Sequence, residues 1–254
     1  MDIDYGKLIE QEGIQSIVLT DIDNEAIKES LSYLKLQSQK IQVSSFDYLG
    51  KKSYIDDMQK LVIELNRNEV TKEIAVNKVE EFFDTLLKSM EDESYLDYIG
   101  NKFDLCIILP IYTQMLYLQL DDALKKTKGY RFIKGLLLQK MIHIIDCFNR
   151  NVVKCINRDG YLFDLSDIIE EALSNQDGSL HNNATLDSRE SATIDTMKKI
   201  EAYEKTYGVG LGSFGLINIC EYLIEHEAYY YEWTFSPKRR FLVKGLLLSR
   251  SSNQ

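Results

Sequence analysis

The sequence is poor in residues that interrupt regular structure: its 254 residues include only two prolines and 13 glycines. This scarcity indicates that long structureless linkers are absent. Hydrophobic residues make up 44% of the chain and charged residues 28%, which is ordinary globular composition rather than that of a disordered chain. We therefore expect residues 1–254 to form a single large domain, with room for a sizeable insertion.

Cysteine is also sparse, and its spacing excludes the common metal and redox motifs. Cys106, Cys147, Cys155 and Cys220 form neither a CxxC pair nor a zinc-finger pattern, so we interpret all four as reduced thiols. No apolar run approaches the roughly 18 residues that span a bilayer. The acidic N-terminus, residues 1–4, is unlike a secretory signal. These absences predict a cytoplasmic protein without a membrane partner.

Basic residues are outnumbered, with 30 Lys and Arg against 40 Asp and Glu and a net charge of −10. Such a chain repels phosphate backbones, which argues against a nucleic-acid partner. His143, His181 and His226 are the only histidines, and none stands in a metal-binding pattern, so no metal site is expected. The remaining partners are a small-molecule substrate or another protein.

The N-terminal part of the chain has the pattern of a βαβ unit. Residues 14–19 are almost continuously apolar, which is typical of a parallel strand buried on both faces. Ile27, Leu31 and Leu34 then recur at helical spacing, and residues 41–45 read as a second strand. We expect a right-handed crossover between the two strands.

Residues 53–98 interrupt this alternation with two amphipathic helices, which the turn at residues 66–68 separates. We interpret them as an inserted helical hairpin. The hairpin is either a cap over a site or a dimer surface, so a homodimer is one expectation.

The rest of the chain predicts a sheet closed by an antiparallel hairpin. In chain order the expected elements are a strand at 103–109, helices at 113–126 and 131–150, a turn at 157–160, a strand at 161–165, a polar loop at 174–194, helices at 195–206 and 213–225, and strands at 228–235 and 241–248. The predicted fold class is α/β, with a doubly wound, mostly parallel sheet, a C-terminal antiparallel hairpin and a helical insertion.

Acidic and aromatic residues follow the ends of the first two predicted strands. Ligands of open parallel sheets bind beyond the carboxyl ends of the strands, where Asp21 and Asp23 follow the first strand and Phe46 and Asp47 the second. A carboxylate can accept both hydroxyls of a ribose, and an aromatic ring beside an acid can hold an adenine. Asp23 is equally suited to capping the helix that it precedes.

These segments resemble the class I S-adenosylmethionine-dependent methyltransferases, in order and spacing more than in any one motif. The segments that carry the resemblance are residues 16–23 with Ala26 and Ile27, Ser45-Phe-Asp47, residues 101–110, residues 160–167 and residues 233–248. They resemble the second to fifth strands of that Rossmann-like family and its closing antiparallel pair.

The resemblance implies S-adenosylmethionine as cofactor, with Asp21 on the ribose and Phe46 and Asp47 at the adenine. Pro110 and Tyr112 stand where amino-methylating members have Asn/Asp-Pro-Pro-Tyr, which implies contact with the substrate. Leu109 replaces the polar first residue of that motif, so amine activation of that type is not predicted.

The sequence departs from the family at its start. Only thirteen residues precede Ile14, where the family's first strand and glycine-rich loop are expected. We expect either a shortened version of the family or a strand supplied by another segment or subunit. Without the missing strand, residues 14–19 would expose a strand edge or need a partner there.

A glycine-rich run at residues 208–215 superficially resembles a dinucleotide-binding loop. It follows a helical pattern rather than a strand, so a turn between two helices is favoured over a phosphate site.

The sequence as a whole leads to two hypotheses of function. The chain is an S-adenosylmethionine-dependent methyltransferase-like protein, acting on a small molecule, or a degenerate, cofactor-free domain of that kind which serves as a binding partner or scaffold.

Overall fold

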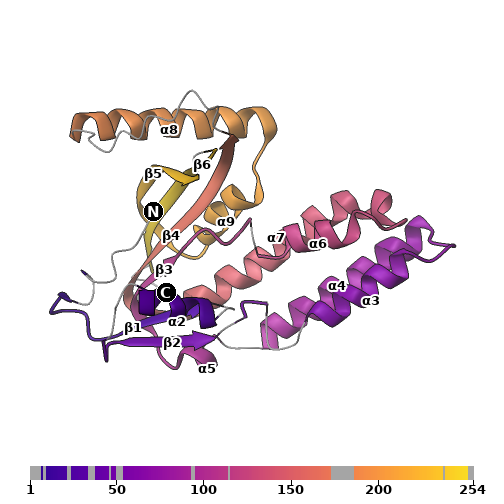
Figure 1. Cartoon of the computed structure of the whole chain (residues 1–254), viewed down its shortest axis with the longest axis horizontal. Helices are drawn as coiled ribbons and strands as arrows, with labels where there is room; N and C mark the ends of the chain where they lie inside the picture. The colour runs from indigo at the N-terminus through magenta and orange to yellow at the C-terminus, as the bar shows by residue number, and fades with distance from the viewer. Residues whose placement is uncertain are drawn as a thin grey trace.

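The computed structural model describes residues 7, 10–21, 24–33, 38–45, 47–49, 54–92, 95–113, 115–172, 186–236 and 238–250. Within these residues the chain folds as an α/β protein with two separate sheets (Figure 1). None of the described helices is long and apolar enough to cross a membrane.

The first sheet is the predicted βαβ unit. β1 (Ile17–Asp21) and β2 (Ile41–Ser45) are parallel and joined by α2 (Asn24–Tyr33), with Ile17 paired to Ile41 and Asp21 paired to Ser45. The apolar run predicts a strand buried on both faces, but the side chains from Ile17 to Thr20 are only half-buried. The prediction of burial was wrong because, among the described elements, only α2 and the four-residue α5 (Leu96–Ile99) pack against this two-stranded sheet.

Four helices form the elongated part of the molecule (Figure 1). α3 (Tyr54–Leu65) and α4 (Lys72–Asp92) lie beside α6 (Tyr117–Leu124) and α7 (Tyr130–Lys154), and the short α5 (Leu96–Ile99) follows α4. Their shared core contains Leu65, Val79, Phe83, Met90, Leu120, Leu137, Met141 and Phe148. The start of α6 is later than predicted because the chain first turns to bury Tyr112 and Leu116.

The second sheet has the strand order β3-β4-β6-β5. β3 (Phe103–Ile108) is parallel to β4 (Ile156–Ala172), whereas β6 (Arg239–Ser249) is antiparallel to both β4 and β5 (Ile224–Ser236). The C-terminal hairpin is therefore confirmed. Within the described part of the chain β3 is not hydrogen-bonded to β1, so a single doubly wound sheet stays a prediction.

The turn predicted at 157–160 lies inside β4, where the pairing with β3 is irregular. Phe103 pairs with Ile156 and Leu105 with Tyr161. Residues 157–160 of β4 therefore lie opposite a single residue of β3, Asp104. Gly160 is needed at this bulge, because an added Cβ would lie 2.9 Å from the Phe103 carbonyl oxygen.

Helices pack on the face of this sheet that carries Leu162, Asp164 and Ser166, which we call the inner face. α9 (Leu211–Ile219) and α7 pack on β4, and α8 (Leu186–Tyr207) packs on β5. The loop predicted at 174–194 was wrong for residues 186–194, which are helical because this segment is polar yet contains neither glycine nor proline. Residues 174–185 lie outside the described residues.

Candidate functional site at the carboxyl ends of the strands

The structure brings two of the predicted nucleoside-binding acids to one edge of the first sheet. Asp21 is the last residue of β1 and pairs with Ser45, the last residue of β2. Asp47 follows two residues later and is half-buried, and its Oδ1 accepts a hydrogen bond of 2.9 Å from the Leu49 backbone N–H. Asp23 and Phe46 lie outside the described residues.

Tyrosine hydroxyls hydrogen-bond the segment after β2 to β1 and to the residues around α5. The Tyr48 hydroxyl donates to the Thr20 carbonyl oxygen at 3.2 Å, and the Tyr95 hydroxyl donates to the Tyr48 carbonyl oxygen at 2.8 Å. Tyr54, the first residue of α3, donates to Gln119 Oε1 of α6 at 2.7 Å. Burial and then the nearby charge of Asp47 raise the pKa of Tyr54, so the hairpin of α3 and α4 begins beside this acid.

Tyr112, predicted to contact substrate, belongs to a buried polar network instead of an open surface. Its side chain is 0% exposed. Its hydroxyl lies 2.5 Å from Asp164 Oδ2 and 2.9 Å from Asn149 Oδ1. Substrate contact with Tyr112 would require this network to open. Pro110, the other predicted substrate residue, is half-buried just beyond β3.

The charge state of Asp164 follows from its complete burial, which raises its pKa to about 7 against the opposing effect of the Tyr112 hydrogen bond. A single hydroxyl proton cannot serve two acceptors. When Asp164 is protonated it donates to Tyr112, whose own proton then goes to Asn149. Protonation therefore satisfies the contacts among these three side chains, whereas Asp164 Oδ1 has no hydrogen-bond partner among the described residues.

α9 approaches the network closely enough to require glycine. An added Cβ on Gly215 would lie 2.4 Å from the Tyr112 ring. The Asn149 amide donates to the Gly215 carbonyl oxygen at 3.1 Å and to Asn218 Oδ1 at 2.9 Å. The buried asparagine thus fixes α7, α9 and the segment after β3 relative to one another.

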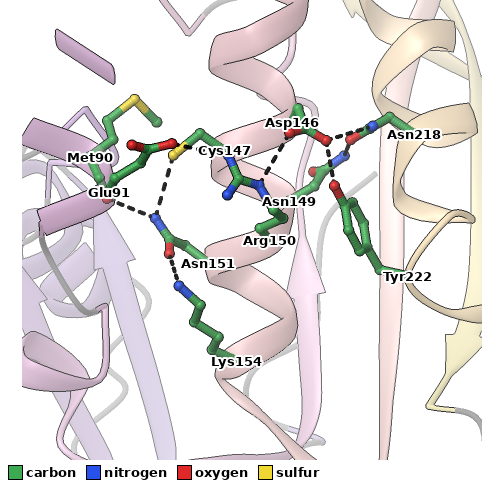
Figure 2. Close-up of polar contacts among 10 residues, drawn as sticks. All are labelled: Met90, Glu91, Asp146, Cys147, Asn149, Arg150, Asn151, Lys154, Asn218 and Tyr222. Carbon is green, nitrogen blue, oxygen red and sulfur yellow. Dashed lines mark hydrogen bonds and ion pairs between the residues drawn. The ribbon is translucent and has the colours of Figure 1, made fainter. Parts of the chain in front are cut away.

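The network continues along α7 (Figure 2). Asp146 Oδ2 accepts from Arg150 Nε at 3.2 Å, and Asp146 Oδ1 accepts from Asn218 at 3.0 Å and from Tyr222. Burial alone would raise the pKa of Asp146, but the hydrogen bonds from Tyr222 and Asn218 and the Arg150 charge lower it. Arg150 also reaches Glu91 of α4 at 3.5 Å. α7 is therefore joined by polar contacts to α4 and α9.

A second polar pair lies beyond the carboxyl end of β3, where Thr113 meets Asp167 inside β4. Thr113 Oγ1 donates to Asp167, with distances of 2.8 and 3.0 Å to the two carboxylate oxygens, and both residues are half-buried. Burial raises the pKa of Asp167. The first turn of α9 lies against β4 at Asp167, because a Cβ on Gly212 would be 2.5 Å from the Asp167 carbonyl oxygen.

Phe148 of α7 brings the strand ends of the two sheets together. Tyr48, which follows β2, and Tyr112, which follows β3, both meet the Phe148 ring edge-on, at centroid distances of 5.6 and 6.0 Å. The candidate site therefore consists of two groups: Asp21 and Asp47 at the ends of β1 and β2, and Pro110 and Thr113 after β3 with Asp167 of β4.

The sequence places Asp167 after the strand predicted at 161–165, but this was wrong because β4 continues to Ala172. Sequence reasoning also missed Thr113, Asp164 and Asn149. A lone acid within the apolar run 161–165 was the available signal for Asp164. The sequence contains no signal for Asn149, because its role depends on the approach of α9.

The glycine-rich run connects two helices, as predicted. Gly208 has a φ of +84°, and α9 begins at Leu211 after α8. Within the described residues no group of three His, Cys, Asp or Glu side chains could hold a metal ion.

Comparison with known proteins assigns no family. No family model matches the sequence, and no curated protein matches it. Among solved structures, the chain is similar to the N-methyltransferase NodS from Bradyrhizobium japonicum WM9, with 13% identity, a TM-score of 0.37, and coverage of 92% of this chain and 74% of NodS. A pericyclic reaction enzyme gives 9% identity, a TM-score of 0.33, and coverage of 95% of this chain and 38% of that enzyme. At these TM-scores neither likeness bears on function.

Proposed function

We propose that this chain is an S-adenosylmethionine-dependent methyltransferase-like protein that acts on a small molecule. The observation that carries the proposal is the position of Asp21 and Asp47 at the carboxyl ends of two adjacent parallel strands. Ligand sites of open α/β sheets are found at such ends. The net charge of −10 disfavours a nucleic-acid substrate.

The donor set at these strand ends fits the nucleoside part of the cofactor. The Asp21 carboxylate would take the two ribose hydroxyls, and Asp47, oriented by the Leu49 N–H, would accept from the adenine amine. The described residues contain no strand that leads through glycines into a helix, so the methionine part has no equivalent cradle here.

When bound, the cofactor supplies an electrophilic methyl group on a sulfonium. The contribution of the chain is to hold donor and acceptor in line, and positioning alone can supply much of the rate of such a displacement. We assign the orientation of the methyl acceptor to Thr113 and Asp167, and a further contact with the acceptor to Pro110. Asp167, whose pKa burial raises, is suited to accepting a proton from the acceptor group.

Isothermal titration calorimetry with S-adenosylmethionine and S-adenosylhomocysteine tests the proposal. We expect micromolar binding that Asp21→Ala weakens by at least tenfold, which corresponds to about 1.4 kcal/mol. Asp84→Ala, at an exposed acid of α4, is the matched control and should bind normally. Absence of heat from folded wild-type protein, or equal binding by Asp21→Ala, would refute the cofactor assignment.

The second candidate is a cofactor-free domain that serves as a binding partner or scaffold. It is favoured by the missing glycine cradle and by the exposure of apolar side chains on β3, where Leu105 is 51% exposed. A folded protein that gives no heat with either cofactor form would select this function.

A further inference from the structure

The four-stranded sheet has a second face, opposite α7, α8 and α9, which we call the outer face. Strand pairing defines it, since cross-strand partners share a face. Leu105 pairs with Tyr161 and Ile107 with Phe163, while Phe163 pairs with Leu247. The outer face consists of Leu105, Ile107, Leu109, Tyr161, Phe163, Leu165, Asp167, Glu170, Ala172, Ile224, Glu227, Tyr229, Tyr231, Trp233, Ser236, Arg239, Phe241, Val243, Gly245, Leu247 and Ser249.

This face presents apolar side chains to solvent. Leu105, Ile107 and Leu109 are 51%, 39% and 46% exposed, and Tyr161 is 46% exposed. They are neighbours, because alternate residues of β3 share a face and Tyr161 is the partner of Leu105. The helices that pack on this sheet do so on its inner face, where Leu162 and Leu246 are buried with Leu216 and Ile219 of α9 (Figure 1).

The described helices that pack on this sheet lie on its inner face. On the outer face Leu165 and Val243 are buried, at 1% and 4% exposed, whereas the apolar side chains of β3 on this face and the adjacent Tyr161 are exposed. Parallel strands are normally covered on both faces, and contiguous exposed apolar surface marks an interaction site. β3 also has one edge without a strand partner among the described residues, and an unpaired edge can accept a further backbone.

Aromatic rings extend the patch across the sheet. Phe163 meets Tyr229 edge-on at 5.5 Å, and Tyr229 stacks with Tyr231 at 6.3 Å. Tyrosine is enriched at protein interfaces because it combines apolar area with a polar tip. This composition fits a polypeptide partner better than a small polar ligand.

The charges on the outer face determine the chemistry of that partner. Glu227 and Asp167 contact the hydroxyls of Tyr229 and Thr113, and no cation pairs with either among the described residues. The face also carries Glu170 and Arg239, which pair with each other at 2.9 Å and so cancel in charge. The two remaining acids, on a chain with net charge −10, favour a cationic occupant and disfavour a second copy of the same chain. We propose that the outer face binds a cationic, amphipathic segment of another polypeptide.

A designed helical peptide of about 18 residues, with leucines on one face and lysines on the other, is the probe. Fluorescence anisotropy should detect binding that weakens with added salt. The double variant Leu105→Lys/Ile107→Lys and the single variant Glu227→Lys should each lower the affinity at least tenfold. Both change exposed side chains, so circular dichroism should show unchanged folding.

Two matched variants test whether the peptide binds at this face. Leu138→Lys changes an equally exposed leucine on α7, and Glu73→Lys reverses an exposed acid on α4; both should leave peptide affinity unchanged. The proposal is wrong if the outer-face variants bind the peptide normally, or if a peptide with glutamate in place of lysine binds equally well.

Light scattering provides an independent check. A dimer that Ile107→Lys converts to monomer would overturn the proposal by making a second copy the occupant. The result is separate from the proposed enzymatic function, because the outer-face variants Leu105→Lys/Ile107→Lys and Glu227→Lys should leave cofactor binding, as measured by calorimetry, unchanged.

Discussion

The Asp164 carboxyl makes stability depend on pH through burial. Its pKa is about 7 in the fold, against about 3.9 in an unfolded chain. The folded state therefore keeps this proton to higher pH than the unfolded state does. The stabilisation is complete below about pH 4 and is lost as the pH rises through about 7. Each pKa unit corresponds to about 1.4 kcal/mol, so the loss amounts to a few kcal/mol.

Asp164→Asn should remove this dependence, because the amide N–H can donate to Tyr112 as the protonated carboxyl does, and the amide does not titrate. Urea unfolding at several pH values between 4 and 8, followed by Trp233 fluorescence, gives the free energy of unfolding of both proteins. The difference, wild type minus variant, should fall across this range and level off above pH 7. A constant difference would mean that Asp164 is ionised throughout.

At the same scale, the sequence predicted which residues stand at strand ends but not which side chains meet. Asp21 and Asp47 were found because a polar residue after an apolar run marks the end of a strand, whereas Asp167, predicted by the same rule, lies inside β4, which continues to Ala172. The Tyr112, Asn149 and Asp164 contacts join residues of three separate elements. Such contacts depend on how the elements pack, which no local pattern encodes.

At the scale of elements, two helical glycines should respond oppositely to a methyl group. In α9, Gly215→Ala would drive a Cβ to 2.4 Å from the buried Tyr112 ring, and overpacking of this kind costs about 1–3 kcal/mol. In α7, Gly135 is exposed with nothing within 4 Å of an added Cβ. Gly135→Ala should stabilise the protein by up to about 1 kcal/mol through helix propensity.

Thermal unfolding of the two variants checks this pair. We expect a lower Tm for Gly215→Ala and an equal or higher Tm for Gly135→Ala. If Gly215→Ala were as stable as the wild type, α9 would have to move away from Tyr112 without cost, and the Asn149 contacts would not hold α9 in place.

The elements themselves were largely predictable, and the failures have identifiable causes. The strands predicted at 14–19, 41–45 and 103–109 correspond to β1, β2 and β3, because burial of apolar side chains drives strand formation. The start of α8 was missed because helix formation there does not depend on an apolar face. The bulge of β4 was read as a turn, because asparagine, aspartate and glycine favour both.

At the scale of the whole molecule, what covers each strand could not be predicted. An apolar run indicates that a strand tends to be covered but does not identify the covering element, and neither β1 nor β3 has cover on both faces among the described elements. Within the described residues, β1 and β2 form a sheet separate from the one that contains β3, and no local pattern in the sequence predicts this separation.

Hydrogen exchange should rank the strands by how completely they are paired. β6 is paired on both sides, β3 on one side, and β1 and β2 form a two-stranded sheet. Small, half-exposed units open locally at a lower free energy than the global transition. Backbone amides of β6 should therefore exchange slowest, those of β3 faster, and those of β1 and β2 fastest.

Mass spectrometry of peptides from the exchanged protein measures this order. Protection of β1 equal to that of β6 would mean that the two sheets unfold as one unit, as a single doubly wound sheet would. The predicted order instead implies that cofactor bound at Asp21 and Asp47 slows exchange mainly in β1 and β2, the part of the molecule with the most stability to gain.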